Sequence, residues 1–272
     1  MDKPQPASVQ TIGRVSQVLR ALAEGPADGM RLSAVAGAAG LGKTTALRLL
    51  KALAEVGYAE FDDDARLYRL GYGLFLLGQS ARRFHIIDLA RAGLDRLAAT
   101  TGDTVFLSVR DGDVAHCIDR RTGSYPIRTL TLSVGDRRPL GVGAGSLALL
   151  AFESDAEIDR VLAANAAERR AYPGFTDAAL RAMIVAARQS GHAFNDGRIV
   201  TAMNAVGVPV LDEAGRVAAA LSVAAIRERM APDRLAGIVG RLKQEASELG
   251  GLLDGRRRAA ARPANRRVEE KL

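Results

Sequence analysis

The chain has 272 residues, of which 48% are hydrophobic and 25% charged, a composition typical of globular proteins and a length sufficient for two domains. Its one cysteine, Cys117, excludes a disulfide framework and a clustered thiolate metal site, and it fits a reducing cytoplasm. The net charge of +7 is divided into +1 for residues 1–73, +2 for residues 74–253 and +4 for residues 254–272, so the total is weak support for a nucleic-acid-binding domain.

No secretory signal is expected, because the first thirty residues hold acidic and proline residues and no apolar segment after a basic start. No uninterrupted apolar run is as long as the about 18 residues that a membrane span needs. We therefore expect a cytoplasmic protein that does not associate with membranes.

The first third of the chain predicts three short helices and then a two-stranded hairpin. Apolar residues at helical spacing follow Ser8, and glycines at 40 and 57 end the second and third helices. The expected elements are a disordered lead 1–7, helices from 8 to 24, 34 to 39 and 43 to 56, and strands 58–61 and 67–70 around the acidic turn 62–66. This order is typical of a winged helix-turn-helix over residues 8–72, whose third helix would begin in a major groove of DNA.

The remaining chain mixes strands and helices in groups, without strict alternation, which indicates the α+β class. A linker helix over 73–86 leads into a second domain over 87–251, and a disordered basic tail is expected over 252–272. The expected strands are 104–110, 114–120, 127–134, 192–196, 205–210 and 217–225, and the expected helices are 87–101, 145–152, 155–165, 177–190 and 232–249.

A glycine-rich segment supports an enzyme as an alternative. Residues 37–44, Gly-Ala-Ala-Gly-Leu-Gly-Lys-Thr, match the GxxxxGK[ST] pattern of nucleotide-binding loops, with Lys43 for the phosphates and Thr44 for magnesium. That loop requires a buried strand directly before it. Residues 32–36 instead have helical spacing, so the match alone is weak support for a nucleotide hydrolase.

The same residues suit DNA. Lys43, Thr44, Thr45 and Arg48 would lie on the exposed face at the start of the third helix, where hydroxyls and cations can contact phosphates and base edges. No acidic residue occurs between positions 42 and 54. The alternatives are a solvated helix face and a ligand-binding module whose small N-terminal domain contacts protein.

Other candidate chemistry is sparse. His85, His116 and His192 lack the spacing of metal ligands, and in a strand Cys117 would point away from His116, so neither a metal site nor a catalytic dyad is expected. Residues 141–146, Gly-Val-Gly-Ala-Gly-Ser, open a helix whose N–H groups could bind an anion, or they form a tight turn. We expect no catalytic residue and no cofactor.

Several segments together resemble the IclR-type family of bacterial transcriptional regulators, over about residues 8–250. The segments are Leu32-Ser33-x-x-Ala36, 40–50, Leu53 with Gly57-Tyr58, 68–71, 135–140, 148–151, 207–210 with Gly215, and 219–223. No single piece is decisive, but their order and spacing are highly specific.

The resemblance implies a winged helix-turn-helix, a linker helix and a GAF-like mixed α/β domain that binds a small organic effector. It also implies homodimers or homotetramers on palindromic double-stranded DNA operators. By the same matching, the DNA-binding residues would be Lys43, Thr44, Thr45 and Arg48, with Arg66 and Arg69 in the wing for phosphates. The effector would lie near Ile127, Leu130, Ala144, Gly145, Asn195, Ala205 and Ser222.

The chain departs from the family at three places. Glycines and small residues fill 141–147, where many relatives have His-Cys-Thr-Ala-Leu-Gly-Lys, the usual acidic run is here 195–198, Asn-Asp-Gly-Arg, and Arg138 stands at an often apolar position. A glycine-lined helix start with Arg138 or Arg198 favours a carboxylate effector. The alternative is that both arginines face solvent.

The leading hypothesis is thus a sequence-specific transcriptional regulator whose operator binding responds to an effector, through a shift between arrangements that space the recognition helices differently. A nucleotide hydrolase and a protein-contacting ligand module remain the alternatives.

Overall fold

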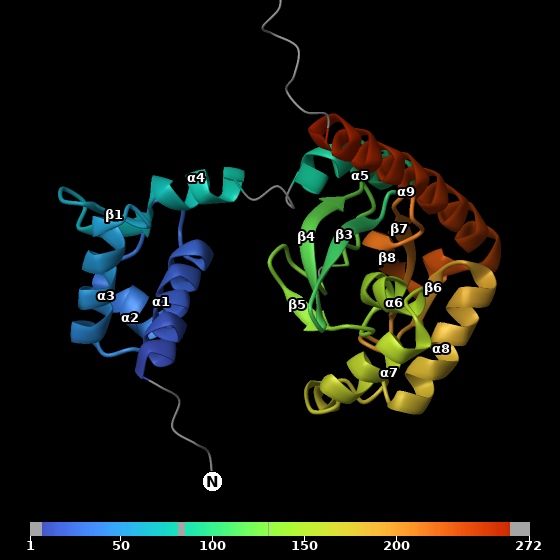
Figure 1. Cartoon of the computed structure of the whole chain (residues 1–272), viewed down its shortest axis with the longest axis horizontal. Coiled ribbons are helices and arrows are strands. Elements are labelled where there is room, and N and C mark those ends of the chain that lie inside the picture. The colour runs from blue at the N-terminus through green and yellow to red at the C-terminus, as the bar shows by residue number, and fades with distance from the viewer. Residues whose placement is uncertain (1–6, 81–84, 130, 262–272) are drawn as a thin grey trace, which may run out of the picture. The chain divides into compact units, whose positions relative to one another are not determined.

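The computed structural model describes residues 7–80, 85–129 and 131–261, and the chain divides into two units, residues 1–85 and 86–272 (Figure 1). No described helix is both long and apolar enough to cross a membrane.

The N-terminal unit has the predicted order of three helices and a hairpin, followed by one more helix. Its elements are α1 (Ala7–Glu24), α2 (Leu32–Ala38), α3 (Lys43–Glu55), β1 (Ala59–Asp62), β2 (Leu67–Leu70) and α4 (Tyr72–Ser80). β1 and β2 pair antiparallel from Ala59↔Leu70 to Asp62↔Leu67. The winged helix-turn-helix prediction is confirmed.

Helical periodicity explains why α3 is held firmly. Ala46, Leu49, Leu50 and Leu53 recur on one face and are buried against residues of α1 and α2. The opposite face stays in solvent. Gly57, at φ +74°, ends this helix in the left-handed conformation, which costs glycine little.

The C-terminal unit is built on one antiparallel sheet of six strands in the order β5-β4-β3-β8-β7-β6. The strands are β3 (Thr104–Asp111), β4 (Val114–Thr122), β5 (Arg137–Pro139), β6 (Ala193–Asp196), β7 (Met203–Leu211) and β8 (Val217–Ile226). The helices are α5 (His85–Thr101), α6 (Ala144–Ala151), α7 (Asp155–Ala164), α8 (Asp177–Ser190) and α9 (Pro232–Ala261), with short 3-10 turns at Glu168–Ala171 and Arg227–Met230. The α+β class is confirmed.

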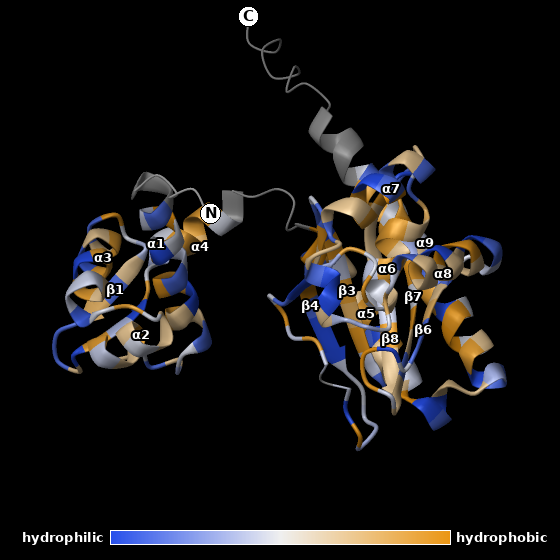
Figure 2. Ribbon diagram, turned by 90° about the horizontal axis from the view of Figure 1, so that it is seen from below, coloured by the Kyte–Doolittle hydropathy of each residue, from blue (hydrophilic) through white to orange (hydrophobic). Residues whose placement is uncertain are grey.

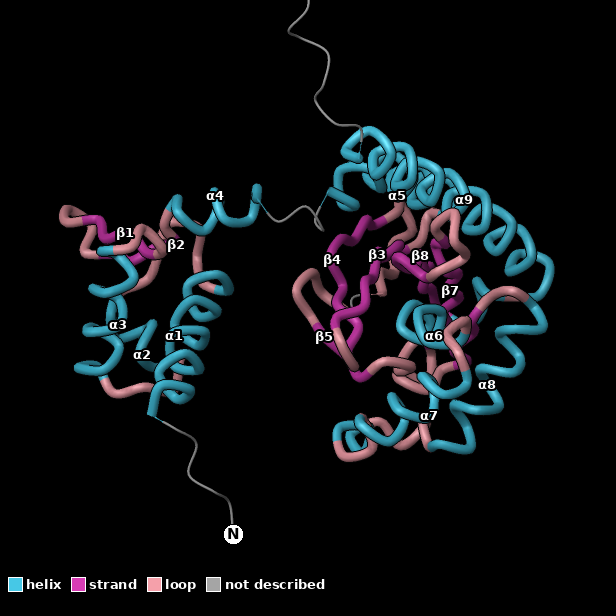
Figure 3. Tube along the Cα trace, in the orientation of Figure 1, coloured by secondary structure: helices cyan, strands magenta, loops and turns pink. Residues whose placement is uncertain are grey.

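Helices cover both faces of this sheet (Figures 1 and 3). Alternate residues of β3, β7 and β8 face α5 and α9, as Leu107, Val208 and Leu221 do. The other face carries α6, with α7 and α8 outside it, around a second apolar cluster. Figure 2 shows these strands coloured largely as hydrophobic, in keeping with burial on both sides.

A buried carboxylate joins the end of α5 to the start of α9. The side chain of Asp103 is 1% exposed and accepts hydrogen bonds from Arg229 at 2.8 Å and Arg234 at 2.5 Å. Both guanidinium groups also donate to the Thr101 carbonyl, at 2.9 and 2.7 Å. These bonds satisfy the carboxylate and fix the corner of the sheet.

The strand predicted over 127–134 is wrong. The edge of β4 is occupied instead by residues 135–139: Gly135 donates to the Cys117 carbonyl at 2.8 Å, Cys117 donates to the Asp136 carbonyl at 3.0 Å, and β5 follows. Residues 127–129 and 131–134 therefore run as an irregular segment, and Leu130 lies outside the described residues.

The chain termini also differ from expectation. Residues 252–261, assigned to the disordered tail, continue α9 as helix to Ala261, because alanine and arginine are strong helix formers and the next proline is at 263. Residues 1–6 of the predicted lead and 262–272 of the predicted tail lie outside the described residues.

Candidate functional site

The start of α3 presents an exposed cationic surface. Lys43, Thr44, Arg48 and Lys51 are exposed and Thr45 is half-buried, because the apolar residues between them occupy the buried face. The N-cap residue Gly42 makes no side-chain hydrogen bond, and the first turn contains no acidic residue. Unpaired N–H groups, hydroxyls and cations thus gather at one helix end, which suits phosphate groups.

The structure does not provide the strand that a nucleotide-binding loop requires. The segment before the glycines is α2, and Leu41 donates back to the Ala36 carbonyl at 2.9 Å in the turn between the two helices. Residues 37–44 therefore comprise the end of α2, the turn 39–42 of a helix-turn-helix and the start of α3 at Lys43.

The two wing arginines are engaged within their own hairpin. Arg69 donates to the Asp62 carboxylate, and Arg66 lies 3.9 Å from the Asp63 carboxylate and 5.1 Å from the centre of the Phe61 ring. The sequence prediction treated both arginines as available for phosphates and overlooked these neighbours. The acidic residues of the turn, Asp62 and Asp63, were the sequence signal that could have indicated these ion pairs.

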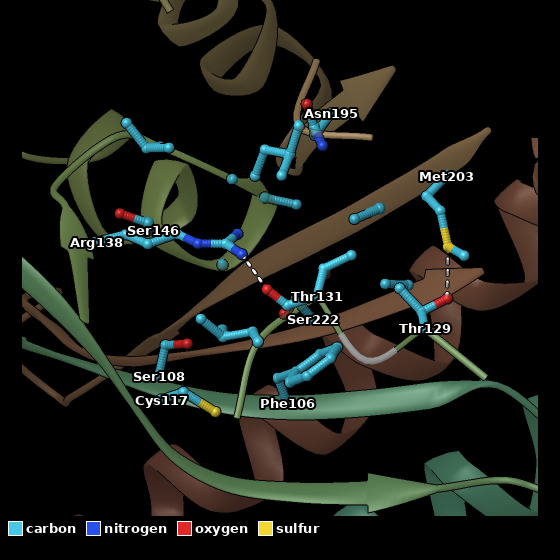
Figure 4. A pocket seen from close by; sticks show the side chains of 18 of the residues that line it. Phe106, Ser108, Cys117, Thr129, Thr131, Arg138, Ser146, Asn195, Met203 and Ser222 are labelled. Carbon is cyan, nitrogen blue, oxygen red and sulfur yellow. Dashed lines mark hydrogen bonds between the residues drawn. The ribbon is translucent and has the colours of Figure 1, made fainter. Parts of the chain in front are cut away.

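A pocket lies between the sheet and the start of α6, on the face opposite α5 and α9 (Figure 4). It encloses about 630 Å³, counted to its open mouth. It is lined by Phe106, Ser108, Ala115, Cys117, Thr129, Thr131, Leu132, Arg138, Val142, Gly143, Ala144, Gly145, Ser146, Asn195, Ile199, Val200, Met203, Asn204, Ala205, Ser222 and Ala224.

Most of the predicted effector residues meet at this pocket. The residues found there are Arg138, Ala144, Gly145, Asn195, Ala205 and Ser222. Ile127 is 51% exposed and does not line the pocket, because the strand expected to carry it is absent, and Leu130 lies outside the described residues. Arg198 also lies elsewhere: it donates to Asp196 and to the Gly174 carbonyl, each at 3.0 Å.

Glycines bring the start of α6 close to the floor of the pocket. Gly143 is the N-cap, with φ +91° and no side-chain cap hydrogen bond. A Cβ atom at Gly145 would lie 3.0 Å from the Ser222 hydroxyl oxygen and 3.2 Å from that of Ser108. The start of α6, whose first N–H groups have no side-chain cap, therefore borders a site that also holds serine hydroxyls.

Arg138 supplies the only charge among the described lining residues. Its guanidinium donates to the Thr131 carbonyl, and no described carboxylate forms an ion pair with it (Figure 4). Burial lowers the pKa of this arginine, because desolvation disfavours the charged form. A cation held in this way gains from an anion that enters the pocket.

Two further polar groups line the pocket and differ in character. Asn195 is 4% exposed, and its Oδ1 has no hydrogen-bond partner. Burial raises the pKa of the Cys117 thiol to about 12, so the thiol stays protonated and is no nucleophile. His116 lies on the other face, 3.7 Å from Asp111. The dyad judged improbable from strand alternation is not formed between these two residues.

The residue-by-residue prediction missed several side chains of the floor. Phe106, Ser108 and Cys117 belong to strands that were predicted correctly, and strand alternation places them on the same face as Ser222. Finding these residues from the sequence would have required the order in which the strands pair, because that order decides which strand faces meet at the pocket.

Family descriptions match both units. Residues 11–63 match the IclR helix-turn-helix domain, and residues 78–250 match the bacterial transcriptional regulator IclR C-terminal domain.

Individual proteins agree with these matches. The chain is 28% identical over 243 residues to the HTH-type transcriptional regulator BhcR of Paracoccus denitrificans, which covers 89% of this chain and 86% of BhcR. It is 30% identical over 244 residues to SauR of Cupriavidus necator, which covers 87% of this chain and 92% of SauR. An IclR homologue from Microbacterium hydrocarbonoxydans, solved in complex with 4-hydroxybenzoate, shares the fold with a TM-score of 0.72 at 23% identity, covering 90% of this chain and 99% of that one.

Proposed function

The chain belongs to the IclR family of bacterial transcriptional regulators and carries the family's helix-turn-helix DNA-binding domain, and from this premise we propose that a small carboxylate in the C-terminal pocket controls its binding to operator DNA. We assign residues 8–72 to the DNA-binding domain and residues 87–251 to the effector domain. The site of action is the cytoplasm, and the protein is a regulator without catalytic activity.

One observation supports the carboxylate: Arg138 is a half-buried cation with no carboxylate among the described lining residues, beside the start of α6, which has no side-chain cap. An anion there would receive charge-assisted hydrogen bonds from the guanidinium and from backbone N–H groups. The bound 4-hydroxybenzoate of the Microbacterium homologue is itself a carboxylate, which is in keeping with this chemistry.

The proposed DNA-binding residues are Lys43, Thr44, Thr45 and Arg48 at the start of α3. Their exposure and the absence of acids in the first turn support direct contact with phosphates and base edges. Arg66 and Arg69 are proposed as weaker contributors, since each first has to leave a carboxylate of the wing.

We propose a homodimer or homotetramer on a palindromic operator. Exposed apolar residues on α4 support it: Tyr72, Phe75, Leu76 and Leu77 are each more than half exposed. Figure 2 colours part of this helix as hydrophobic. The effector would act by binding one arrangement of the subunits more tightly than another.

Two measurements test the assignment. Binding of the DNA upstream of the protein's own gene, measured by fluorescence anisotropy at stated salt, should fall at least about tenfold in Lys43→Ala. Magnesium-dependent ATP turnover that disappears in the same variant would support the nucleotide-hydrolase alternative instead.

Calorimetry with a panel of organic acids tests the pocket. Arg138→Ala should weaken carboxylate binding about tenfold or more, because it removes a charged hydrogen bond. Arg198→Ala is the matched control, since that arginine lies outside the pocket and is paired with Asp196. Unchanged affinity in Arg138→Ala would refute the carboxylate assignment.

A further inference from the structure

The pocket is closed by residues from the two opposite edges of one sheet. Arg138 belongs to β5 and Asn195 to β6, the first and last strands in the order β5-β4-β3-β8-β7-β6. The sheet curls, so that both side chains reach the same cavity (Figure 4). A ligand in this cavity is therefore contacted from both edges.

The amide of Asn195 is buried without a partner for its oxygen. It is 4% exposed, and its Oδ1 forms no hydrogen bond. Asn165 is equally buried, and its Nδ2 donates to the Asp113 carbonyl at 2.7 Å. Buried carboxamides normally find partners, so the orphaned amide at the pocket wall indicates a partner that arrives with the ligand.

A second asparagine, Asn204, also lines the pocket. It is 7% exposed and its Oδ1 is unpartnered as well. Along β7 it is in phase with Val206 and Val208, which pack against α5 and α9. Asn195 instead pairs in register with Ala205, a residue of the pocket floor.

The chemistry of the amide restricts what it can recognise. A carboxylate only accepts hydrogen bonds and cannot satisfy an amide oxygen, whereas a hydroxyl donates to that oxygen. Between the two edges the floor has an apolar part, formed by Phe106 and Ala224 with Leu132 beside them, next to the hydroxyls of Ser108 and Ser222. The wall at Asn195 thus suits a neutral donor on an apolar body.

We infer that Asn195 is a specificity residue that reads a hydroxyl group of the effector, whose carboxylate is held by Arg138. This inference rests on the carboxylate effector proposed above. The ligand class is a hydroxylated organic acid with its carboxylate and its hydroxyl at opposite ends of an apolar segment. A site that hydrogen-bonds a hydroxyl discriminates strongly against the analogue that lacks it, because the buried partner is then left unpaired.

The test uses pairs of acids that differ only in the hydroxyl: benzoate with 4-hydroxybenzoate, and butanoate with 4-hydroxybutanoate. Calorimetry on the full-length protein should give at least one pair in which the hydroxy acid binds about tenfold more tightly. In Asn195→Ala this ratio should fall to about one, while the affinity for the unsubstituted acid stays within about twofold of wild type. Asn195→Leu, of similar volume, repeats the test if the alanine variant is unstable.

Two controls separate specificity from general damage. Asn165→Ala removes an equally buried amide that lies outside the pocket, where it donates to the Asp113 carbonyl, and should keep the wild-type ratio. Arg138→Ala should weaken both members of a pair by the same factor.

The outcomes distinguish this inference from the proposal beneath it. Equal affinities within every pair, or a ratio that survives in Asn195→Ala, overturn the role of Asn195 and leave the carboxylate site standing. Failure of every acid to bind overturns the carboxylate site and this inference together.

Discussion

Single residues of the pocket owe their properties to burial more than to their neighbours. Arg138 is desolvated without an ion pair to any described carboxylate, and Cys117 is held as a neutral thiol. In both side chains burial shifts the pKa towards the neutral form, downwards for Arg138 and upwards for Cys117.

Cys117 offers a prediction at this scale, since it is the only cysteine of the chain. A rise of its pKa from 9.0 to about 12 lowers the thiolate fraction at pH 8 about a thousandfold. Alkylation by iodoacetamide should therefore be slower by about that factor in the native protein than in the protein unfolded in guanidinium, followed by mass spectrometry. Rapid labelling of the native protein would contradict the burial of this thiol.

Whether the sequence predicted a pocket residue correctly depended on the kind of information behind the prediction. Arg138 and Asn195 were found from the family pattern and its departures, and both line the pocket. Ile127 came from the same family pattern but does not line the pocket, since residues 127–129 form no strand. Ser108 was missed because its pocket face follows from the order of strands in the sheet, which is a long-range property.

At the scale of elements, the sequence predicted helices and strands correctly where local interactions decide the structure. The helix predicted over 177–190 is α8 with the same bounds, Asp177–Ser190, and both ends are capped: the Thr176 hydroxyl accepts from Ala179 N–H, and Gly191 is in the left-handed conformation. The error at 127–134 arose because alternation signals a strand but cannot say that another segment already occupies the sheet edge.

The wing gives a prediction about DNA binding. Its hairpin, residues 59–70, carries four acidic residues and only Arg66 and Arg69 as bases. Asp63→Asn removes a negative charge and frees Arg66, so DNA affinity should rise about threefold to tenfold and the salt dependence should steepen by about one phosphate contact. Anisotropy titrations over a range of salt measure both quantities.

Glu168→Gln, the same change of charge in the other unit, is the control for that experiment. Equal affinity of Asp63→Asn and wild type would mean that the wing stays away from phosphates and that Arg66 is no DNA contact.

A second element-level prediction concerns the junction of α7 with the β3–β4 hairpin. Glu157 receives hydrogen bonds from Arg160, at 2.8 Å, and from Arg110, and these hold its pKa at about 2, below the ordinary 4.5. Because the folded pKa is the lower one, this stabilisation is present above pH 4.5 and disappears as the pH falls towards 2. Glu157→Gln should lower the free energy of unfolding at pH 7 by about 0.5–1 kcal/mol, since the group is partly exposed.

Urea unfolding at pH 7, 4 and 3 checks the sign. The difference between wild type and Glu157→Gln should shrink steadily as the pH falls below 4.5. A difference that is constant with pH would show that Glu157 contributes by packing alone.

At the scale of the whole molecule, each unit has a core of its own. The N-terminal cluster draws only on residues of α1 to β2 and the loops between them, and the large clusters of the C-terminal unit draw only on residues from 86 onward. DNA contact and ligand contact are thereby assigned to separately packed bodies.

Residues 86–261 alone should therefore bind the same acids as the full chain, with dissociation constants within about twofold. Calorimetry on this fragment and on the intact protein makes the comparison, and circular dichroism shows that the fragment is folded. A folded fragment that has lost ligand affinity would mean that the N-terminal unit completes the pocket.

The short edge strands have a kinetic consequence. β5 is joined to its neighbour by three residue pairs and β6 by four, whereas β7 and β8 share nine. The walls that carry Arg138 and Asn195 are thus the most loosely fastened parts of the sheet, and such segments open at lower free-energy cost than its centre. We expect small molecules to enter and leave when β5 or β6 opens briefly. The residence time of a ligand should then depend on how strongly its own contacts with Arg138 and Asn195 hold these two strands in place.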